Sequence, residues 1–174
     1  MQKAVLAALR ERRSCRAYLP HEIPDKTIAQ IISAGTWAPT AGNVQPWYFY
    51  VLRDDYLKSK LAEAALQQKF IAQAPVVIVV CADLEKSRQA YGKRGEELYC
   101  IQDCAAAAQN MLLAAHSLGL GACWVGAFDE HAVSALIGVL PAQRPLSLLC
   151  FGKAGQIARE PGRLPLHRVY SEVD

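Results

Sequence analysis

The segment Val76–Cys81 limits the possible folds more than any other part of the chain. Its residues, VVIVVC, are apolar throughout and mostly β-branched, with no polar residue at alternate positions. Because successive side chains of a strand point to opposite faces of a sheet, such a run is typical of a central strand buried on both faces. Other elements must therefore cover the sheet on both sides.

Segments with helical periodicity come before, between and after the expected strands, which indicates an α+β fold arranged as an α/β sandwich. Pro24 and Asp25 begin one helix, and Asp129 is a good N-cap for another, which Gly138 ends. Helices are expected near residues 5–10, 25–35, 54–69, 84–91, 95–118 and 130–137, and strands at 47–52, 76–81, 122–125 and 144–151.

Two segments have features that suggest contact with a further surface. The helix at 95–118 has small side chains on every face of its middle part, Cys104–Ala108. We expect it to be buried, either at the centre of the fold or in a dimer interface. Residues 160–174 contain Pro161 and Pro165 and show no clear period, so we expect an extended C-terminal arm that lies on another surface.

Length and composition fit a single globular domain covering residues 1–174. Hydrophobic residues make up 52% of the chain and charged residues 20%, an apolar excess of the kind that a subunit interface would bury. The net charge of +3 is too small to predict nucleic-acid binding, which needs a strongly basic face.

Neither a signal peptide nor a membrane span is expected. Met1–Arg13 becomes charged after only a short apolar stretch, and the apolar run Val76–Ala82 is too short to cross a bilayer. The six cysteines form no Cys-x-x-Cys pair and lack further ligands at zinc-like spacing. We therefore expect free, buried thiols, no metal site and a protein of the reducing cytoplasm.

The loop 38–47, APTAGNVQPW, is rigid and carries neutral hydrogen-bonding groups. Its two prolines exclude a regular helix, and its glycine permits a tight turn or the close approach of a ligand. Thr40, Asn43 and Gln45 supply a hydroxyl and two amides. These groups suit a flat heteroaromatic ligand better than a metal or a bare phosphate, although a purely structural turn would also explain them.

A second polar cluster, RRSCR at residues 12–16, lies where the first helix runs into an extended segment. Guanidinium groups are fork-shaped donors that suit a phosphate monoester, and a solvated basic patch at a helix end is the alternative. Arg163 in the tail is a further candidate contact. Together with loop 38–47 and the glycine-rich end of strand 122–125, this cluster fits a phosphorylated heteroaromatic cofactor.

Other kinds of active site are less well supported. The stretch Gly119–Trp124 lacks the third glycine of a dinucleotide motif and lies between a helix and a strand, the reverse of the Rossmann order. The chain has no Walker loop and no Gly-x-Ser-x-Gly elbow, and its four histidines are scattered. Neither a Rossmann nicotinamide site nor a hydrolase site is therefore expected.

Four motifs in this order resemble the nitroreductase family of flavin enzymes. They are RRSCR from Arg12, APTAGNVQPW from Ala38, GLGACWVGAF from Gly119 and GRLP from Gly162. Their order and spacing match over almost the whole chain. The resemblance implies a central, mainly antiparallel sheet of four or five strands flanked by helices. It also implies a homodimer with FMN at the subunit interface and with the C-terminal arm packing on the partner subunit.

The resemblance further implies which residues contact the cofactor. The N-terminal cluster would hold the phosphate, ribityl chain and pyrimidine edge of FMN, while loop 38–47 would reach in from the partner subunit. The stretch after strand 122–125 would face the isoalloxazine, where a backbone N–H can meet flavin N5, and C-terminal residues would contact the phosphate end. These residues are Arg12, Arg13, Ser14, Arg16, Pro39, Thr40, Ala41, Asn43, Gln45, Val125, Gly126, Ala127, Gly152 and Arg163.

The implied activity is that of an FMN-dependent oxidoreductase with ping-pong kinetics. NADH or NADPH would reduce the flavin and leave, and a small acceptor such as a nitroaromatic or a quinone would then be reduced in its place. Because the flavin carries out the redox chemistry, no side chain is expected as an essential acid or base. Two alternatives are other flavin chemistry on this fold, such as reductive dehalogenation or flavin breakdown, and a non-catalytic flavin-binding or sensing protein.

Overall fold

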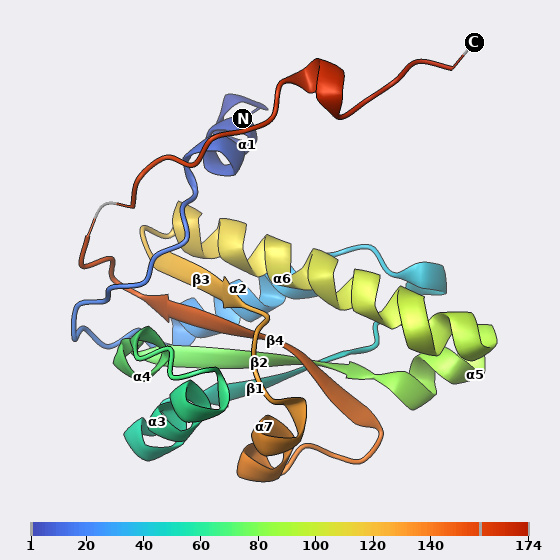
Figure 1. Cartoon of the computed structure of the whole chain (residues 1–174), viewed down its shortest axis with the longest axis horizontal. Helices are drawn as coiled ribbons and strands as arrows, with labels where there is room; N and C mark the ends of the chain where they lie inside the picture. The colour runs from blue at the N-terminus through green and yellow to red at the C-terminus, as the bar shows by residue number, and fades with distance from the viewer. Residues whose placement is uncertain (1, 157, 174) are drawn as a thin grey trace.

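The computed structural model describes residues 2–156 and 158–173, with a four-stranded sheet at its centre (Figure 1). The strands are β1 (Trp47–Leu52), β2 (Val76–Asp83), β3 (Gly121–Val125) and β4 (Gln143–Gly152). Their order is β1-β2-β4-β3 and all neighbours are antiparallel. This confirms the expected α+β fold and makes β1 and β3 the two edges of the sheet.

Strand β2 is buried on both faces, as its sequence predicts. Every residue from Val76 to Ala82 is fully buried. Val76, Ile78 and Val80 belong to one apolar core, and Val77 and Val79 belong to another. The sheet therefore separates two cores, each of which needs its own layer of helices.

One core lies under α2 (Asp25–Thr36) and α6 (Cys100–Ser117), which run along the same face of the sheet (Figure 1). Ile31 of α2 is fully buried in this core. Gly35 lets the two helices approach closely, because a Cβ atom there would lie 2.8 Å from Met111 Cγ. The small side chains of α6 thus serve close packing at the centre of the fold.

The other core lies under α3 (Asp55–Ala64), α4 (Phe70–Gln73) and α7 (Glu130–Ile137). The single helix expected at 54–69 is wrong, because α3 ends at Ala64 and a turn precedes α4. Leu66 and Gln67 have φ values of 57° and 58° in this turn, in the left-handed region that non-glycine residues rarely adopt. The turn contains neither glycine nor proline, so its sequence does not indicate that the helix ends there.

The helix expected at 95–118 begins with a different geometry. Helix α5 (Leu84–Arg94) leads into a π-helical turn, η2 (Gly95–Tyr99), which continues into α6. Helical geometry also breaks inside α5, where Gly92 has a φ of 58° and a ψ of −148°. Isolated π turns within helices often mark functional sites. No helix in the ranges 2–156 and 158–173 has the length and apolar character that a membrane span requires.

Both ends of the described chain extend from the body of the molecule (Figure 1). Helix α1 (Gln2–Glu11) contacts α6, yet Val5 is 62% exposed. From Arg159 to Val173 every residue is exposed, and a single turn, η3 (Leu166–Arg168), interrupts the extended course. The packing of this arm on a partner subunit stays a prediction.

All six cysteines are free and buried, as expected from the sequence. Burial raises the pKa of Cys81 to about 12. Burial is also the main cause that raises the pKa of Cys100, Cys104, Cys123 and Cys150. These thiols are therefore packing residues that stay protonated at neutral pH.

Replacing Leu148 by Ala tests the core behind the β3 edge. Leu148 is fully buried in β4 and pairs with Val125 of β3. We expect the free energy of unfolding to fall by about 2–5 kcal/mol in urea denaturation, because the truncation removes apolar contacts and leaves a cavity. Leu140, which is 57% exposed, is the control, and Leu140→Ala should change stability by less than about 0.5 kcal/mol. Equal losses would contradict the assignment of Leu148 to the core.

Candidate functional site

The N-terminal arginine cluster lies along the free edge of β3. Ser14 forms a parallel bridge with Ala122, and the Cys15 N–H donates a hydrogen bond to the Ala122 carbonyl at 2.9 Å. Ser14 and Arg16 are exposed beside this bridge, and Arg12 closes the last turn of α1, where its N–H donates to the Ala8 carbonyl at 3.0 Å. The segment therefore bridges to the free edge of β3 and brings Arg12, Ser14 and Arg16 beside that strand.

The side chains of Arg12 and Arg16 lie near the face covered by α4. The Arg16 guanidinium carbon is 5.8 Å from the centre of the Phe70 ring, a cation–π contact. Burial raises the pKa of Cys123, and the charges of Arg16 and Arg12 lower it, so both cations are near this thiol. Within the described residues neither arginine pairs with a carboxylate. Together with the exposed Ser14, they form a surface suited to a phosphate group.

Arg13 points elsewhere. Its guanidinium donates to carbonyls at the end of α1, and its Nη2 lies 3.6 Å from Glu160 Oε2 in the tail. With His116 of α6 it lines a cavity of about 300 Å³. The structure therefore separates the Arg13 side chain from those of Arg12 and Arg16, with which it was grouped from the sequence.

The backbone that follows β3 is the next predicted contact of the cofactor. Gly126 and Ala127 are exposed, whereas Val125 is buried. After Cys15 the N-terminal segment turns toward the end of β4, where the Leu19 N–H donates to the Lys153 carbonyl at 2.9 Å and the Gly155 N–H donates to the Ala17 carbonyl at 2.8 Å. The Gln68 side chain donates to the Ala127 carbonyl at 3.3 Å, which ties the stretch to the left-handed turn between α3 and α4.

Loop 38–47 has a strained conformation just before β1. It contains one 3-10 turn, η1 (Ala41–Asn43), and Asn43 and Gln45 have φ values of 57° and 53°. Left-handed dihedrals cost a glutamine about 1 kcal/mol or more, and such strain often occurs at functional sites. Within the loop the Gln45 side chain donates to Asn43 Oδ1 at 3.1 Å, and the Gln45 N–H donates to Thr40 Oγ1 at 3.1 Å.

Two side chains from neighbouring helices anchor this loop. Asp103 of α6 is 7% exposed and its Oδ1 accepts the Ala41 N–H at 3.2 Å. Lys86 of α5 donates from Nζ to the Gln45 carbonyl at 3.1 Å. Burial raises the pKa of Asp103, and the hydrogen bond from Ala41 lowers it to a smaller extent. The conformation of the loop therefore depends on α5 and α6 as well as on its own residues.

The arginine cluster and the loop do not meet within one chain. The loop leads into β1 while the cluster lies along β3, so they occupy opposite edges of the sheet. Three inter-strand spacings of about 4.8 Å separate these edges by about 14 Å. They also lie on opposite faces, since the loop is anchored to α6 and Arg16 lies over Phe70 of α4. Within one chain these two groups therefore do not form one compact site.

The two C-terminal candidates have structural contacts of their own. Gly152 is buried, and a Cβ atom there would lie 2.6 Å from Pro75 Cδ and 2.7 Å from Tyr18 Cδ1, so close packing explains the glycine. Arg163 donates to two carbonyls of its own segment. The contribution of both residues to cofactor binding stays a prediction.

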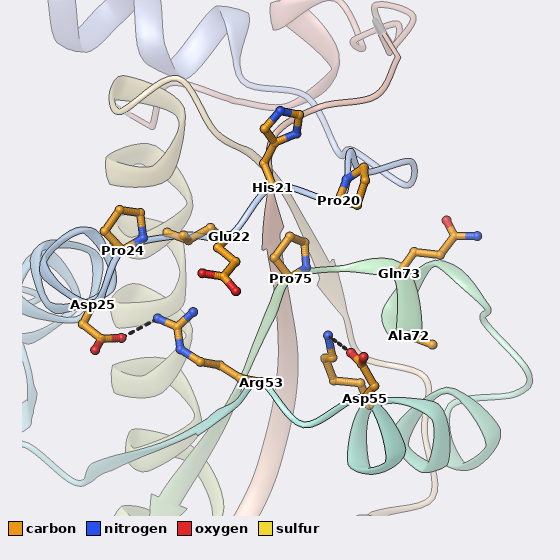
Figure 2. A pocket seen from close by; sticks show the side chains of 12 residues that line it. Pro20, His21, Glu22, Pro24, Asp25, Arg53, Asp55, Ala72, Gln73 and Pro75 are labelled. Atoms are coloured by element: carbon orange, nitrogen blue, oxygen red, sulfur yellow. Dashed lines mark hydrogen bonds and ion pairs between the residues drawn. The ribbon is translucent and has the colours of Figure 1, made fainter.

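A polar cavity of about 610 Å³ opens beyond the end of β1, and none of the predicted cofactor residues lines it (Figure 2). Arg53 pairs there with Asp25 at 2.7 Å, and Lys58 pairs with Asp55 at 2.9 Å. Lys58 Nζ also donates to a backbone carbonyl at 2.9 Å. Because both cations already have carboxylate partners, we do not assign the phosphate-binding site to this cavity.

Several residues near the two groups were not predicted from the sequence. Phe70, Gln68 and Lys86 act through tertiary contacts, and no local pattern marks them. Asp103 does have a signal, because it is the one carboxylate between Cys100 and Ser117 in a largely apolar helix. A lone acid at such a position indicates a specific hydrogen-bond partner.

Comparison with known proteins gives matches over most of the chain. The family model described as "Nitroreductase family" matches residues 9–69 and 64–153. A protein of Archaeoglobus fulgidus, named provisionally as an NADH dehydrogenase/NAD(P)H nitroreductase, is 39% identical over 132 residues, which cover 74% of this chain and 72% of that protein. An NADH dehydrogenase of Thermus thermophilus is 32% identical over 197 residues, covering 95% and 94%. The structure of an NADPH:FMN oxidoreductase from Vibrio harveyi complexed with NAD+ matches with a TM-score of 0.90 and 26% identity, covering 98% of this chain and 77% of that one.

Replacing Asp103 tests how the loop is anchored. In Asp103→Ala the Ala41 N–H loses its acceptor, and we expect hydrogen–deuterium exchange in residues 40–45 to accelerate about tenfold or more, as the loss of a buried charge-assisted hydrogen bond implies. Asp103→Asn keeps an acceptor oxygen of similar geometry and should show a clearly smaller change. Peptide-level mass spectrometry measures both. Identical exchange in Asp103→Ala and the unmodified protein would contradict this anchoring role.

Proposed function

The chain belongs to the nitroreductase family, and from that membership we propose that it is an FMN-dependent oxidoreductase supplied with electrons by NADH or NADPH. The observation that carries the proposal is the pair of cations without acidic partners, Arg12 and Arg16, on either side of Ser14 at the edge of β3, the strand that leads into the exposed backbone of Gly126 and Ala127. The FMN oxidoreductase of Vibrio harveyi, which has a similar fold, supports the choice of cofactor.

The donors on this surface fit FMN chemically. Arg12, Ser14 and Arg16 would bind the phosphate, ribityl chain and pyrimidine edge with charge-assisted and neutral hydrogen bonds. Gly126 has no side chain, so a flat ring can come close to the backbone there, and Val125 and Ala127 would flank it.

Loop 38–47 of a second copy would complete the site. Its Pro39, Thr40, Ala41 and Asn43 would lie against the isoalloxazine, and Gln45 would keep the turn in shape through its bond to Asn43. Asp103 and Lys86 hold the loop before any ligand arrives, which reduces the ordering cost of binding.

The protein's own part in the reaction would be to bind, orient and shield. When bound, FMN would take up a hydride equivalent from NAD(P)H and pass two electrons to a nitroaromatic, a quinone or a similar small acceptor in ping-pong order. The side chains near the proposed site are guanidinium, hydroxyl and amide groups, which orient and stabilise charge. We therefore assign no acid or base role to any side chain.

We also propose that the functional unit is a homodimer. Apolar side chains of α1, α2 and α6, among them Val5, Trp37 and Leu113, line an open groove of about 440 Å³. Trp37 is 84% exposed, and Leu166 and Tyr170 of the tail are 74% and 60% exposed. Apolar surface of this kind is typical of a protein–protein interface. A second copy would cover it and would also bring the loop of one chain to the arginine cluster of the other.

Flavin binding and reduction test the proposed activity directly. We expect the purified protein to show the visible bands of oxidised FMN, and we expect these bands to bleach without oxygen when NADH or NADPH is added. Bands that neither nucleotide bleaches would favour the non-catalytic alternative. A colourless protein that also fails to take up FMN would contradict the proposal.

Substitutions of single arginines test the proposed phosphate contacts. Arg12→Ala and Arg16→Ala should each raise the dissociation constant for FMN about tenfold to a hundredfold, because each removes a charge-assisted hydrogen bond. Arg13→Ala is the matched comparison, since the Arg13 side chain pairs with Glu160 and points away from the cluster, and its effect should be several-fold smaller. Titration of the apoprotein with FMN, followed by flavin fluorescence, measures all three. Equal losses in the three variants would contradict this division of roles.

Removing residues 161–174 tests the dimer and the arm together. We expect the dimer to dissociate at higher protein concentrations than the full chain, because the exposed apolar residues of the arm no longer contribute to the interface. Affinity for FMN should fall in parallel if the site is shared between subunits. Analytical ultracentrifugation over a range of concentrations gives the dissociation constant of the dimer. A full-length chain that is monomeric and still binds FMN would contradict the shared site.

A further inference from the structure

An aromatic pair, the exposed Tyr91 and the half-buried Tyr99, lies with an unpaired cation beside loop 38–47. The rings of Tyr91 and Tyr99 meet edge to face, with centroids 5.4 Å apart and an interplanar angle of 82°. The Arg94 guanidinium carbon lies 5.3 Å from the centre of the Tyr99 ring, and Arg94 Nε donates to the Tyr99 hydroxyl at 2.9 Å. We call Tyr91, Arg94 and Tyr99 the Tyr–Arg cluster.

The cluster touches the loop through Tyr91. A Cβ atom on Gly42 would lie 2.1 Å from the Tyr91 hydroxyl oxygen, so the hydroxyl rests against the loop backbone where only glycine leaves room. The breaks in α5 at Tyr91 and Gly92 and the π turn that follows set the local course of the chain that presents these side chains. The irregular geometry between α5 and α6 therefore coincides with a contact to the candidate site.

Among the described residues, the cations of α5 without an acidic partner are Lys86, which donates to the Gln45 carbonyl, and Arg94. Arg88 pairs with Glu85 at 2.8 Å, and Lys93 pairs with Glu97 at 3.5 Å. Arg94 has a hydrogen bond to a neutral hydroxyl instead, and that bond uses Nε and leaves both terminal nitrogens available. A guanidinium held in this way can donate two parallel hydrogen bonds to a carboxylate.

We propose that the Tyr–Arg cluster selects flat aromatic electron acceptors that carry a carboxylate. This inference rests on the proposed function, because it places the cluster beside the flavin to which loop 38–47 contributes. The tyrosine rings would contact the acceptor ring, and Arg94 would bind its carboxylate. A short, rigid molecule suits this arrangement, because Tyr91 contacts the loop and only the Tyr99 ring lies between Tyr91 and Arg94.

Binding of benzoate and benzamide to the FMN-loaded protein tests the proposal. The two molecules have nearly the same shape, and only benzoate is charged at neutral pH. We expect the visible spectrum of the bound flavin to report a dissociation constant about tenfold lower for benzoate, the size that a charge-assisted pair provides. This preference should shrink as salt is added, because the cluster is exposed.

Variants assign the preference to the cluster. Arg94→Gln should abolish the preference for benzoate, and Tyr99→Phe should reduce it by releasing Arg94 Nε. Arg88→Gln is the matched control in the same helix and should leave the preference unchanged, because Arg88 already pairs with Glu85. The ratio of kcat/KM for para-nitrobenzoate and para-nitrobenzamide should change in the same order.

Three results would overturn the proposal. The first is equal affinity for benzoate and benzamide in the unmodified protein, and the second is a preference that survives in Arg94→Gln. The third concerns the reductant. If Arg94→Gln keeps the benzoate preference and its flavin is reduced more slowly by NADPH but at an unchanged rate by NADH, then Arg94 binds the nucleotide and not the acceptor. Failure of the proposed function is recognised separately, as a protein that binds no FMN or whose flavin neither nucleotide bleaches.

Discussion

The burial of β2 on both faces is the constraint on which the rest of the structure depends. A strand with apolar side chains on both sides needs a helical layer above and below, and α2 with α6 and α3 with α4 and α7 supply them. The buried middle of the sheet therefore offers no place for a polar ligand site. Polar groups collect at its two edges, where the N-terminal segment lies along β3 and the strained loop leads into β1.

Elements with a strong local signal were predicted closely. Strand 47–52 and helix 130–137 have the expected bounds. The apolar run of the strand ends sharply, and the helix is delimited by an Asp cap and a glycine. The break at Leu66 and Gln67 could not be predicted, since left-handed dihedrals at such residues are imposed by tertiary contacts. The chemistry of the site was visible in Arg12, Arg16 and the loop amides. Among its supports, Asp103 stands out in the sequence as the lone carboxylate of α6, whereas Phe70 does not, because the sequence does not show which distant segments meet.

The separation of the two polar groups has an energetic reason. Within one chain, unneutralised guanidinium groups repel further cations, and a loop with open amide positions is costly to bury without a ligand. Placing them at opposite edges and faces lets each remain hydrated until the proposed association of two copies would bring them together. In the proposed dimer, folding of the monomer and completion of the site would therefore be distinct events, and each could be altered with limited effect on the other.

The reactivity of the buried cysteines can report local opening of the helical layers. Thiol reagents react with the thiolate, and burial raises the pKa of Cys81, Cys104 and Cys150 and keeps their sulfur atoms out of reach. Cys104 belongs to one core and Cys150 to the other. The order in which a reagent modifies them would therefore distinguish the lifting of the α2–α6 layer from the lifting of the α3–α4–α7 layer, without any label added to the chain.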